Sequence, residues 1–307
     1  MTLTELKYIV ALARERHFGR AAQACFVSQP TLSVAIKKLE DELAVILFER
    51  GMPDIALTTA GEKIVSQAQY VLNQVQIIRD LAQQGSDPLQ GPLHLGVIYT
   101  IGPYLLPELV PRMMAGTPHM PLILQENFTT QLLQALRQGA LDCAVIAEPF
   151  DSEGLHVEAL YDEPFILALP RDHLWATRPY IEAAELKQQT LLLLGAGHCL
   201  RDQVLAVCPE QPNFVSTAIG IQKTFEGSSL ETIRYMVASG LGITVLPATA
   251  LPKLQIDSAP LCYVPFAQPT PNRRVVLVSR KRFHRPQALA ALSLAIAQCV
   301  LNGVQKR

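Results

Sequence analysis

Two cysteines stand nine positions apart in the stretch "GHCLRDQVLAVC", residues 197–208. Cys199 follows His198 directly, and Arg201 lies two positions further on. The residues between the cysteines predict a short helix with Cys199 near its N-terminus. A helix N-terminus and a neighbouring guanidinium both favour the thiolate form of cysteine. Nucleophilic or redox chemistry at Cys199 is therefore one candidate function of this stretch.

Helix geometry separates the same two cysteines. In a continuous helix the Cα atoms of residues 199 and 208 would be about 13.5 Å apart. A disulfide requires Cα atoms within about 7 Å of each other. A bond between Cys199 and Cys208 would therefore require the helix to unwind, so that its formation would change the local fold.

The other four cysteines show no such setting. Cys143 and Cys262 lie in strand-like runs, and Cys25 and Cys299 lie in alanine-rich helical runs. We expect all four to be small buried hydrophobic residues. No two of the six cysteines form a CxxC motif, which argues against a zinc ribbon, and we expect no metal and no other cofactor.

The composition is that of a globular protein of about two domains. The chain has 307 residues, of which 49% are hydrophobic, and a formal net charge of -1, which does not itself indicate a nucleic-acid partner. The start lacks a signal-peptide pattern. Polar residues interrupt the apolar stretch 288–304, which is shorter than the roughly 20 residues that a membrane span needs. We expect a cytoplasmic protein without a membrane partner.

The first 60 residues predict an all-α domain of short helices. Ser28 is placed to cap the third helix, "QPTLSVAIKKLEDEL", and Leu32, Ile36, Leu39 and Leu43 form one apolar stripe along it. The remaining face suits a helix that enters the major groove of DNA; its residues are Gln29, Pro30, Thr31, Ser33, Val34 and Lys37. Basic and acidic residues balance in this region, so an ordinary helical bundle is the alternative.

A long helix is expected next, followed by a domain boundary. Apolar residues recur at intervals of four and three; they are Ile64, Ala68, Val71, Val75, Ile78 and Ala82. The pattern fits either a helix that pairs with a second copy of the chain or a helix that packs on its own domain. The stretch "QGSDPLQGP" ends it.

From residue 91 onwards, predicted strands and helices alternate, as in an α/β domain. We expect three parts: a domain at 1–60, a linker helix at 61–88 and a regulatory domain at 89–307. The regulatory domain would have two lobes, about 89–163 with 268–307, and about 164–267.

The stretch "HFGRAAQACFVSQPTLSVAIKKLEDELAVILFERGMPDIALTTAG" resembles the winged helix-turn-helix of LysR-type transcriptional regulators. The resemblance implies contacts to promoter DNA from the residues of the third helix, and it places Arg50 near the wing. It also implies a two-lobed regulatory region similar to periplasmic binding proteins. A dimer through the linker helix, a homotetramer and contact with RNA polymerase follow from the same resemblance.

Within that family, "GVIYTIGPYLLP", "QENFT" and "GHCLRDQVLAVC" resemble the activators that sense hydrogen peroxide. This resemblance implies that Cys199 is the peroxidatic thiol and Cys208 the resolving thiol. It also implies a peroxide pocket formed by Thr100, Thr129 and His198 together with Arg201. Without the resemblance, the threonines would be read as helix caps and His198 as a solvated loop residue.

Three classes of function compete. The chain could be a redox-switched transcription factor, a LysR-type regulator whose cleft binds a small inducer, or a thiol peroxidase. The DNA-binding head argues against a peroxidase, and the cysteine segment argues against an inducer-binding regulator with incidental cysteines. We expect a peroxide-responsive activator of antioxidant genes.

The predicted recognition helix can be tested by substitution. Lys37→Ala should weaken specific and non-specific DNA sites alike and flatten the salt dependence of binding by about one unit, because a lysine contact to phosphate releases about one counterion. Footprint titrations at several salt concentrations measure both quantities. If Thr31→Ala combined with Ser33→Ala leaves the affinity for the specific site unchanged, this helix does not read the sequence.

Overall fold

The computed structural model describes residues 1–49, 55–83, 87–207, 229–252 and 260–306. Two residues of interest, Arg50 and Cys208, lie outside these ranges. The chain forms two compact units, one made mainly of residues 1–87 and the other mainly of residues 88–307.

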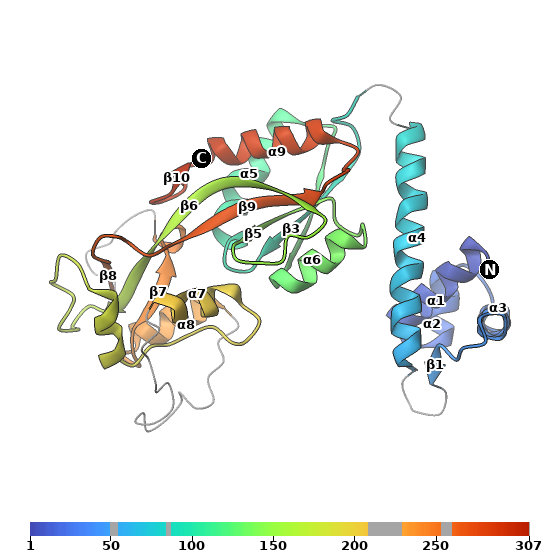
Figure 1. The fold of residues 1–307 in the computed structure, drawn as a ribbon, viewed down its shortest axis with the longest axis horizontal. Helices are drawn as coiled ribbons and strands as arrows, with labels where there is room; N and C mark the ends of the chain where they lie inside the picture. The colour runs from blue at the N-terminus through green and yellow to red at the C-terminus, as the bar shows by residue number, and fades with distance from the viewer. Residues whose placement is uncertain (50–54, 84–86, 208–228, 253–259, 307) are drawn as a thin grey trace. The chain divides into compact units, whose positions relative to one another are not determined.

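The first unit contains the expected short helices and a small β-ribbon (Figure 1). Its elements are α1 (Leu3–Glu15), α2 (Phe18–Ala24), α3 (Gln29–Leu43), β1 (Phe48–Glu49), β2 (Ala56–Leu57) and α4 (Thr59–Gln83). Strands β1 and β2 are antiparallel. The three short helices and the ribbon form a winged helix-turn-helix, which confirms the fold class expected for this region.

Helix α3 begins as its sequence predicts. The Ser28 hydroxyl accepts a hydrogen bond from the Thr31 amide at 3.3 Å, and a proline occupies the first turn, where its missing N–H is not needed. Leu32, Ile36 and Leu39 are fully buried. The opposite face stays accessible: Gln29, Pro30, Thr31, Val34 and Lys37 are exposed, and Ser33 is half-buried.

Helix α4 uses part of its apolar seam within its own unit. Ala68 is buried, and Ile64 and Val71 pack against the same core as α1 to α3. Ile78 is 65% exposed. Packing on the chain's own domain therefore accounts for the first half of the seam. At Ile78 the seam is open to another partner.

The second unit contains a mixed sheet (Figure 1). Its strands lie in the order β10-β6-β9-β5-β3-β4, and β7 and β8 pair with the far half of β6. Strand β3 is parallel to β4 and β5, whereas β9 is antiparallel to β5 and β6. The strands are β3 (Leu93–Ile98), β4 (Leu122–Asn127), β5 (Cys143–Ala147), β6 (Leu155–Pro170), β7 (Thr244–Pro247), β8 (Leu261–Pro265), β9 (Asn272–Arg280) and β10 (Gln305–Lys306).

The helices of this unit match the predicted alternation. They are α5 (Gly102–Gly116), α6 (Thr129–Arg137), α7 (Cys199–Val207), α8 (Leu230–Ala238) and α9 (Pro286–Gln298), with 3₁₀ turns at Ala183–Gln188 and Ala248–Ala250. Each described helix of the chain is too short or too polar to cross a membrane.

Two hydrophobic cores lie along this sheet. The first core draws its residues from Leu93 to Tyr161 and from Val275 to Cys299, and the second core from Phe165 to Phe266. Strand β6 serves both, because its first half packs in the first core and its second half in the second. Figure 1 shows the two long strands β6 and β9 running side by side.

A buried carboxylate connects α3 to the ribbon. Glu40 is 9% exposed and accepts hydrogen bonds from the amides of Leu47 and Phe48 at 2.8 and 3.3 Å. Each donor left unpaired in a buried position costs about 1–3 kcal/mol. The carboxylate therefore fixes the turn that leads from α3 into β1.

Replacing this carboxylate should destabilise the first unit. Glu40→Leu should lower its free energy of unfolding by about 2–4 kcal/mol, because two amides lose their acceptor. Asp41→Leu, at an exposed neighbouring position, should cost less than about 1 kcal/mol. Circular dichroism follows the helices, while fluorescence of Trp175, the only tryptophan, reports the second unit alone. Equal costs for both variants would contradict the assigned role.

Candidate functional site

Three aromatic side chains from separate loops lie in contact with one another. The ring centroid of Phe128 lies 5.3 Å from that of Tyr99 and 4.7 Å from that of His198, and the Tyr99 and His198 rings are 5.9 Å apart. The residue that follows each ring is one of those predicted for the site: Thr100, Thr129 and Cys199. The ring cluster thus brings together the three segments on which the sequence analysis placed the chemistry.

The two threonines are buried and differ in their hydrogen bonds. The Thr100 hydroxyl accepts a hydrogen bond from Nη1 of Arg273 at 2.9 Å. Thr129 is the first residue of α6 and is 8% exposed, yet its hydroxyl has no hydrogen-bond partner among the described residues. Interpreting Thr129 as a helix cap is therefore wrong. An unpaired buried hydroxyl is available to a small polar ligand.

Cys199 is the first residue of α7, as predicted, and it is half-buried. The turn that precedes it contains Gly197 in the left-handed region, at φ +94°. Leu200 and Val204 are buried in the second core, whereas Cys199 packs against the first core. Helix α7 is therefore wedged between the two cores with its thiol on the side of the first.

His198 is a buried residue and not a solvated loop residue. Its exposed fraction is 6%, and burial lowers the pKa of its imidazole below the ordinary value. The neutral imidazole is thus favoured near pH 7. A neutral imidazole can donate one hydrogen bond and accept another, which suits it to a ligand with both hydroxyl donors and acceptors.

A buried ion pair completes the surroundings of Cys199. Arg273 on β9 and Glu163 on β6 face each other across the strands, both side chains are fully buried, and Nε donates to Oε2 at 2.7 Å. Burial by itself lowers the pKa of Arg273, but the nearby charges of Glu163 and of the Cys199 sulfur raise it. Arg273 therefore remains a cation, and its hydrogen bond to Thr100 connects it to the segment of Tyr99 in the ring cluster.

Arg273 was not among the residues predicted for the site. The available signal was the alternation in "NRRVVLV", where Arg273 is in phase with the buried Val275. The family resemblance placed Arg201 in the pocket instead. In the structure Arg201 lies on α7 and its Nη1 donates to the Leu194 carbonyl at 3.0 Å, so that it fastens the loop before the helix.

Burial affects the thiols of three other cysteines. Burial raises the pKa of Cys143 far above the ordinary thiol value, and it also raises the pKa values of Cys25 and Cys299. Cys262 donates a hydrogen bond to the Ala176 carbonyl at 3.3 Å. Cys143 and Cys299 are buried, as expected, whereas Cys25 and Cys262 are only half-buried.

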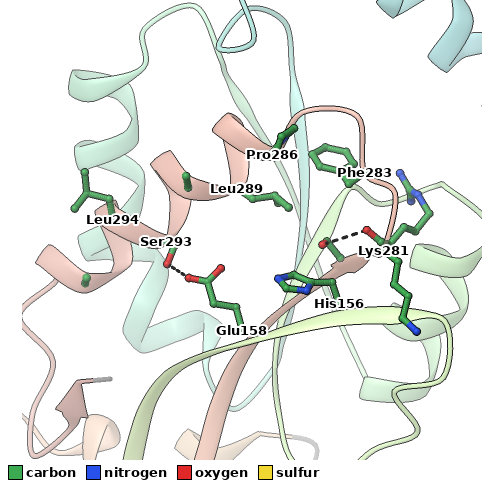
Figure 2. A pocket seen from close by; sticks show the side chains of 12 residues that line it. His156, Glu158, Lys281, Phe283, Pro286, Leu289, Ser293 and Leu294 are labelled. Atoms are coloured by element: carbon green, nitrogen blue, oxygen red, sulfur yellow. Dashed lines mark hydrogen bonds between the residues drawn. The ribbon is translucent and has the colours of Figure 1, made fainter.

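A surface groove of about 590 Å³ lies elsewhere on the second unit, between α9 and strands β6 and β9. Figure 2 shows Glu158 and His156 on its floor, with Ser293 of α9 donating to the Glu158 carboxylate. None of the residues predicted from the sequence lines this groove. The groove is therefore separate from the site around Cys199.

Comparisons with known proteins agree with this geometry. Residues 3–62 match the family described as "Bacterial regulatory helix-turn-helix protein, lysR family", and residues 86–299 match "LysR substrate binding domain". The chain is 44% identical to the hydrogen peroxide-inducible genes activator of Dickeya chrysanthemi over 280 residues, which cover 91% of this chain and 90% of that protein.

Two solved structures show the same fold. The full-length C199D variant of OxyR from Pseudomonas aeruginosa is 49% identical, with a TM-score of 0.77 and coverage of 98% of this chain and 99% of that chain. A hydrogen peroxide-bound cysteine variant of OxyR from Corynebacterium glutamicum is 34% identical, with a TM-score of 0.64 and coverage of 97% and 92%.

The lowered pKa of His198 predicts a pH dependence of stability. In the unfolded chain a histidine has a pKa of about 6.5. Below this pH the histidine becomes protonated in the unfolded chain, whereas the buried imidazole of the folded chain stays neutral down to its lowered pKa. The free energy of unfolding should therefore fall as the pH drops from about 6.5 towards the lowered pKa, by up to about 1.4 kcal/mol per pH unit.

Denaturant unfolding of the second unit between pH 5 and 8 measures this dependence. His198→Gln should flatten the profile, and His156→Gln, a change at an exposed position, should retain it. A profile that is identical in the wild type and in His198→Gln would contradict the assignment.

Proposed function

The chain belongs to the LysR family of bacterial transcriptional regulators, and we propose that it is a hydrogen-peroxide-sensing activator. The observation that carries the proposal is the position of Cys199. Its helix packs between two cores directly after His198, whose ring contacts those of Tyr99 and Phe128. The residues after these two rings are Thr100, which is hydrogen-bonded to the buried cation Arg273, and Thr129, whose hydroxyl has no partner among the described residues. Similarity to proteins named for peroxide response and to a peroxide-bound structure supports the same conclusion.

The first chemical step is the attack of the Cys199 thiolate on one oxygen of hydrogen peroxide. An S–O bond forms, the O–O bond breaks, and hydroxide leaves. Full ionisation of the thiol alone gains little, since a free cysteine is already a few per cent ionised at pH 7. Donors that stabilise the leaving oxygen must supply the rest. We assign this role to His198, Thr129 and Thr100.

Arg273 and Arg201 have different roles in this scheme. Arg273 supplies positive charge beside the sulfur and orients the Thr100 hydroxyl through its hydrogen bond. Arg201 holds the preceding loop and thereby the N-terminus of α7. The second step joins Cys199 to Cys208: the S–O bond of the sulfenic acid breaks, the S–S bond forms, and water leaves with the proton of the second thiol.

The second step has a structural consequence. From Cys199 to Val207 a helix rises about 12 Å, well beyond the reach of about 7 Å that a disulfide allows. Helix α7 must therefore unwind for its first residue to form this bond. Unwinding removes Leu200 and Val204 from the second core, and this repacking carries the signal.

The output of the signal is a change at promoter DNA. Helix α3 contacts the operator through Gln29, Pro30, Thr31, Ser33 and Lys37. Arg50 contacts DNA near the wing. Pairing of two chains through the seam of α4 presents two recognition helices to a site with two-fold symmetry. The active form is a homotetramer that acts in the cytoplasm with RNA polymerase on antioxidant genes. In this proposal the domain at 1–60 binds DNA, the linker helix at 61–88 pairs two chains, and the two lobes of the regulatory domain at 89–307 respond to peroxide.

Peroxide titration with mass mapping tests the proposal. One equivalent of peroxide should oxidise Cys199, and digestion should yield a peptide that links Cys199 to Cys208. Cys199→Ser should abolish the link and slow thiol loss by at least about 100-fold, since the proposal assigns the fast reaction with peroxide to Cys199 alone. Cys143→Ser serves as the matched control and should react as the wild type does. A link through Cys143 or Cys262 would overturn the assignment.

A further inference from the structure

Helix α7 presents two different faces to the two cores. Leu200 and Val204, each 2% exposed, anchor one face in the second core. Cys199 and Gln203 are four residues apart and therefore lie on the same side of the helix. Cys199 packs against the first core. The Gln203 side chain donates from Nε2 to the carbonyl oxygen of Glu148 at 2.6 Å.

Glu148 directly follows β5, the strand Cys143–Ala147, whose residues are all fully buried in the first core. The Glu148 amide is held in turn by the Arg274 carbonyl at 3.0 Å. The acceptor of the Gln203 bond is thus part of a rigid element. One helical turn after Cys199, the hydrogen bond from Gln203 to the Glu148 carbonyl therefore connects α7 to the first core.

This bond satisfies the Gln203 amide only in part. The Oε1 atom is buried and has no hydrogen-bond partner among the described residues. An unpaired buried acceptor offsets much of the free energy that one neutral hydrogen bond contributes. The contact therefore orients α7 without holding it strongly.

We infer that Gln203 is a positioning residue that clasps the thiol-bearing face of α7 to the first core in the reduced state and must let go when the disulfide closes. This inference rests on the proposed function. Peroxide attack on Cys199 takes place with the clasp closed. The second step breaks the S–O bond, forms the S–S bond and releases water, and it requires α7 to leave the Glu148 carbonyl.

The two steps therefore respond differently to loss of the clasp. Gln203→Glu places a carboxylate against the Glu148 carbonyl, which repels it. Gln203→Asn keeps an uncharged amide but is one methylene too short to reach. Both changes remove a contact that exists only in the reduced form. Disulfide closure should become faster by roughly tenfold in Gln203→Glu, where repulsion is added to the lost bond, and by roughly threefold in Gln203→Asn. The thiol–disulfide equilibrium should move towards the disulfide by the same factors, which correspond to about 30 mV and about 14 mV.

The experiment uses the full-length protein and three readouts. Stopped-flow oxidation in a Cys208→Ser background gives the rate of sulfenic acid formation, which should change by less than about twofold in Gln203→Asn because this variant adds no charge near Cys199; Gln203→Glu adds a negative charge one turn from the thiol, so only its closure rate and equilibrium are compared. The same oxidation with Cys208 present gives the closure rate. Equilibration in dithiothreitol buffers of graded redox potential gives the disulfide equilibrium. Gln298→Glu, the same chemical change at an exposed position of α9, is the matched control.

Wild-type closure rate and equilibrium in both Gln203 variants would overturn the clasp and leave the proposed function intact. A slower first step with unchanged closure would also overturn it, since Gln203 would then act on peroxide. If the wild-type protein forms no Cys199–Cys208 disulfide, the proposed function fails and the clasp role fails with it. Circular dichroism of each variant establishes that it is folded.

Discussion

The buried pair of Arg273 and Glu163 is the interaction on which the rest of the second unit depends. It joins β9 to β6 where these strands pass between the two cores, and neither side chain is accessible to solvent. Each partner extends the link: Arg273 donates to the side chain and the carbonyl of Thr100, and Glu163 accepts from Thr249. Loss of one partner would leave a charge buried without compensation, at a cost of about 3–5 kcal/mol. The pair therefore fixes the geometry of the two cores and also the electrostatic environment of Cys199.

Cys199 carries the reactive thiol and lies on the helix that packs between the two cores. Leu200 and Val204 bury one face of α7 in the second core, and Cys199 packs against the first core. A second link between the cores, the hydrogen bond from the Tyr104 hydroxyl to Glu231 at 3.1 Å, joins α5 to α8. Because both cores meet at α7, a covalent change at its first residue alters their packing. Oxidation can in this way be converted into a change of shape.

Much of this arrangement followed from local sequence patterns. The stripe of Leu32, Ile36 and Leu39 predicted the buried face of α3, and the alternation of apolar runs predicted the strands and helices of the second unit. Cys199 was correctly placed at a helix N-terminus. These features depend on neighbours in the sequence, so a single sequence reveals them.

Features that depend on distant residues were not predictable in the same way. Arg273 and Glu163 are 110 positions apart, and nothing local in either segment indicates the other. The burial of His198 arises from Tyr99 and Phe128, which belong to other loops. The seam of α4 was predicted as a spacing, but the spacing alone did not show that α1 to α3 cover its first half.

The central claim is that α7 must leave its place between the cores when Cys199 is oxidised to the disulfide. Hydrogen–deuterium exchange of the peptide that spans residues 199–207 measures this most directly. In the reduced protein the helical amides should be protected, and after one equivalent of peroxide their exchange should accelerate by at least about tenfold, because an unwound helix loses its internal hydrogen bonds. Equal protection of this peptide in the reduced protein and in protein shown to contain the disulfide would contradict the account.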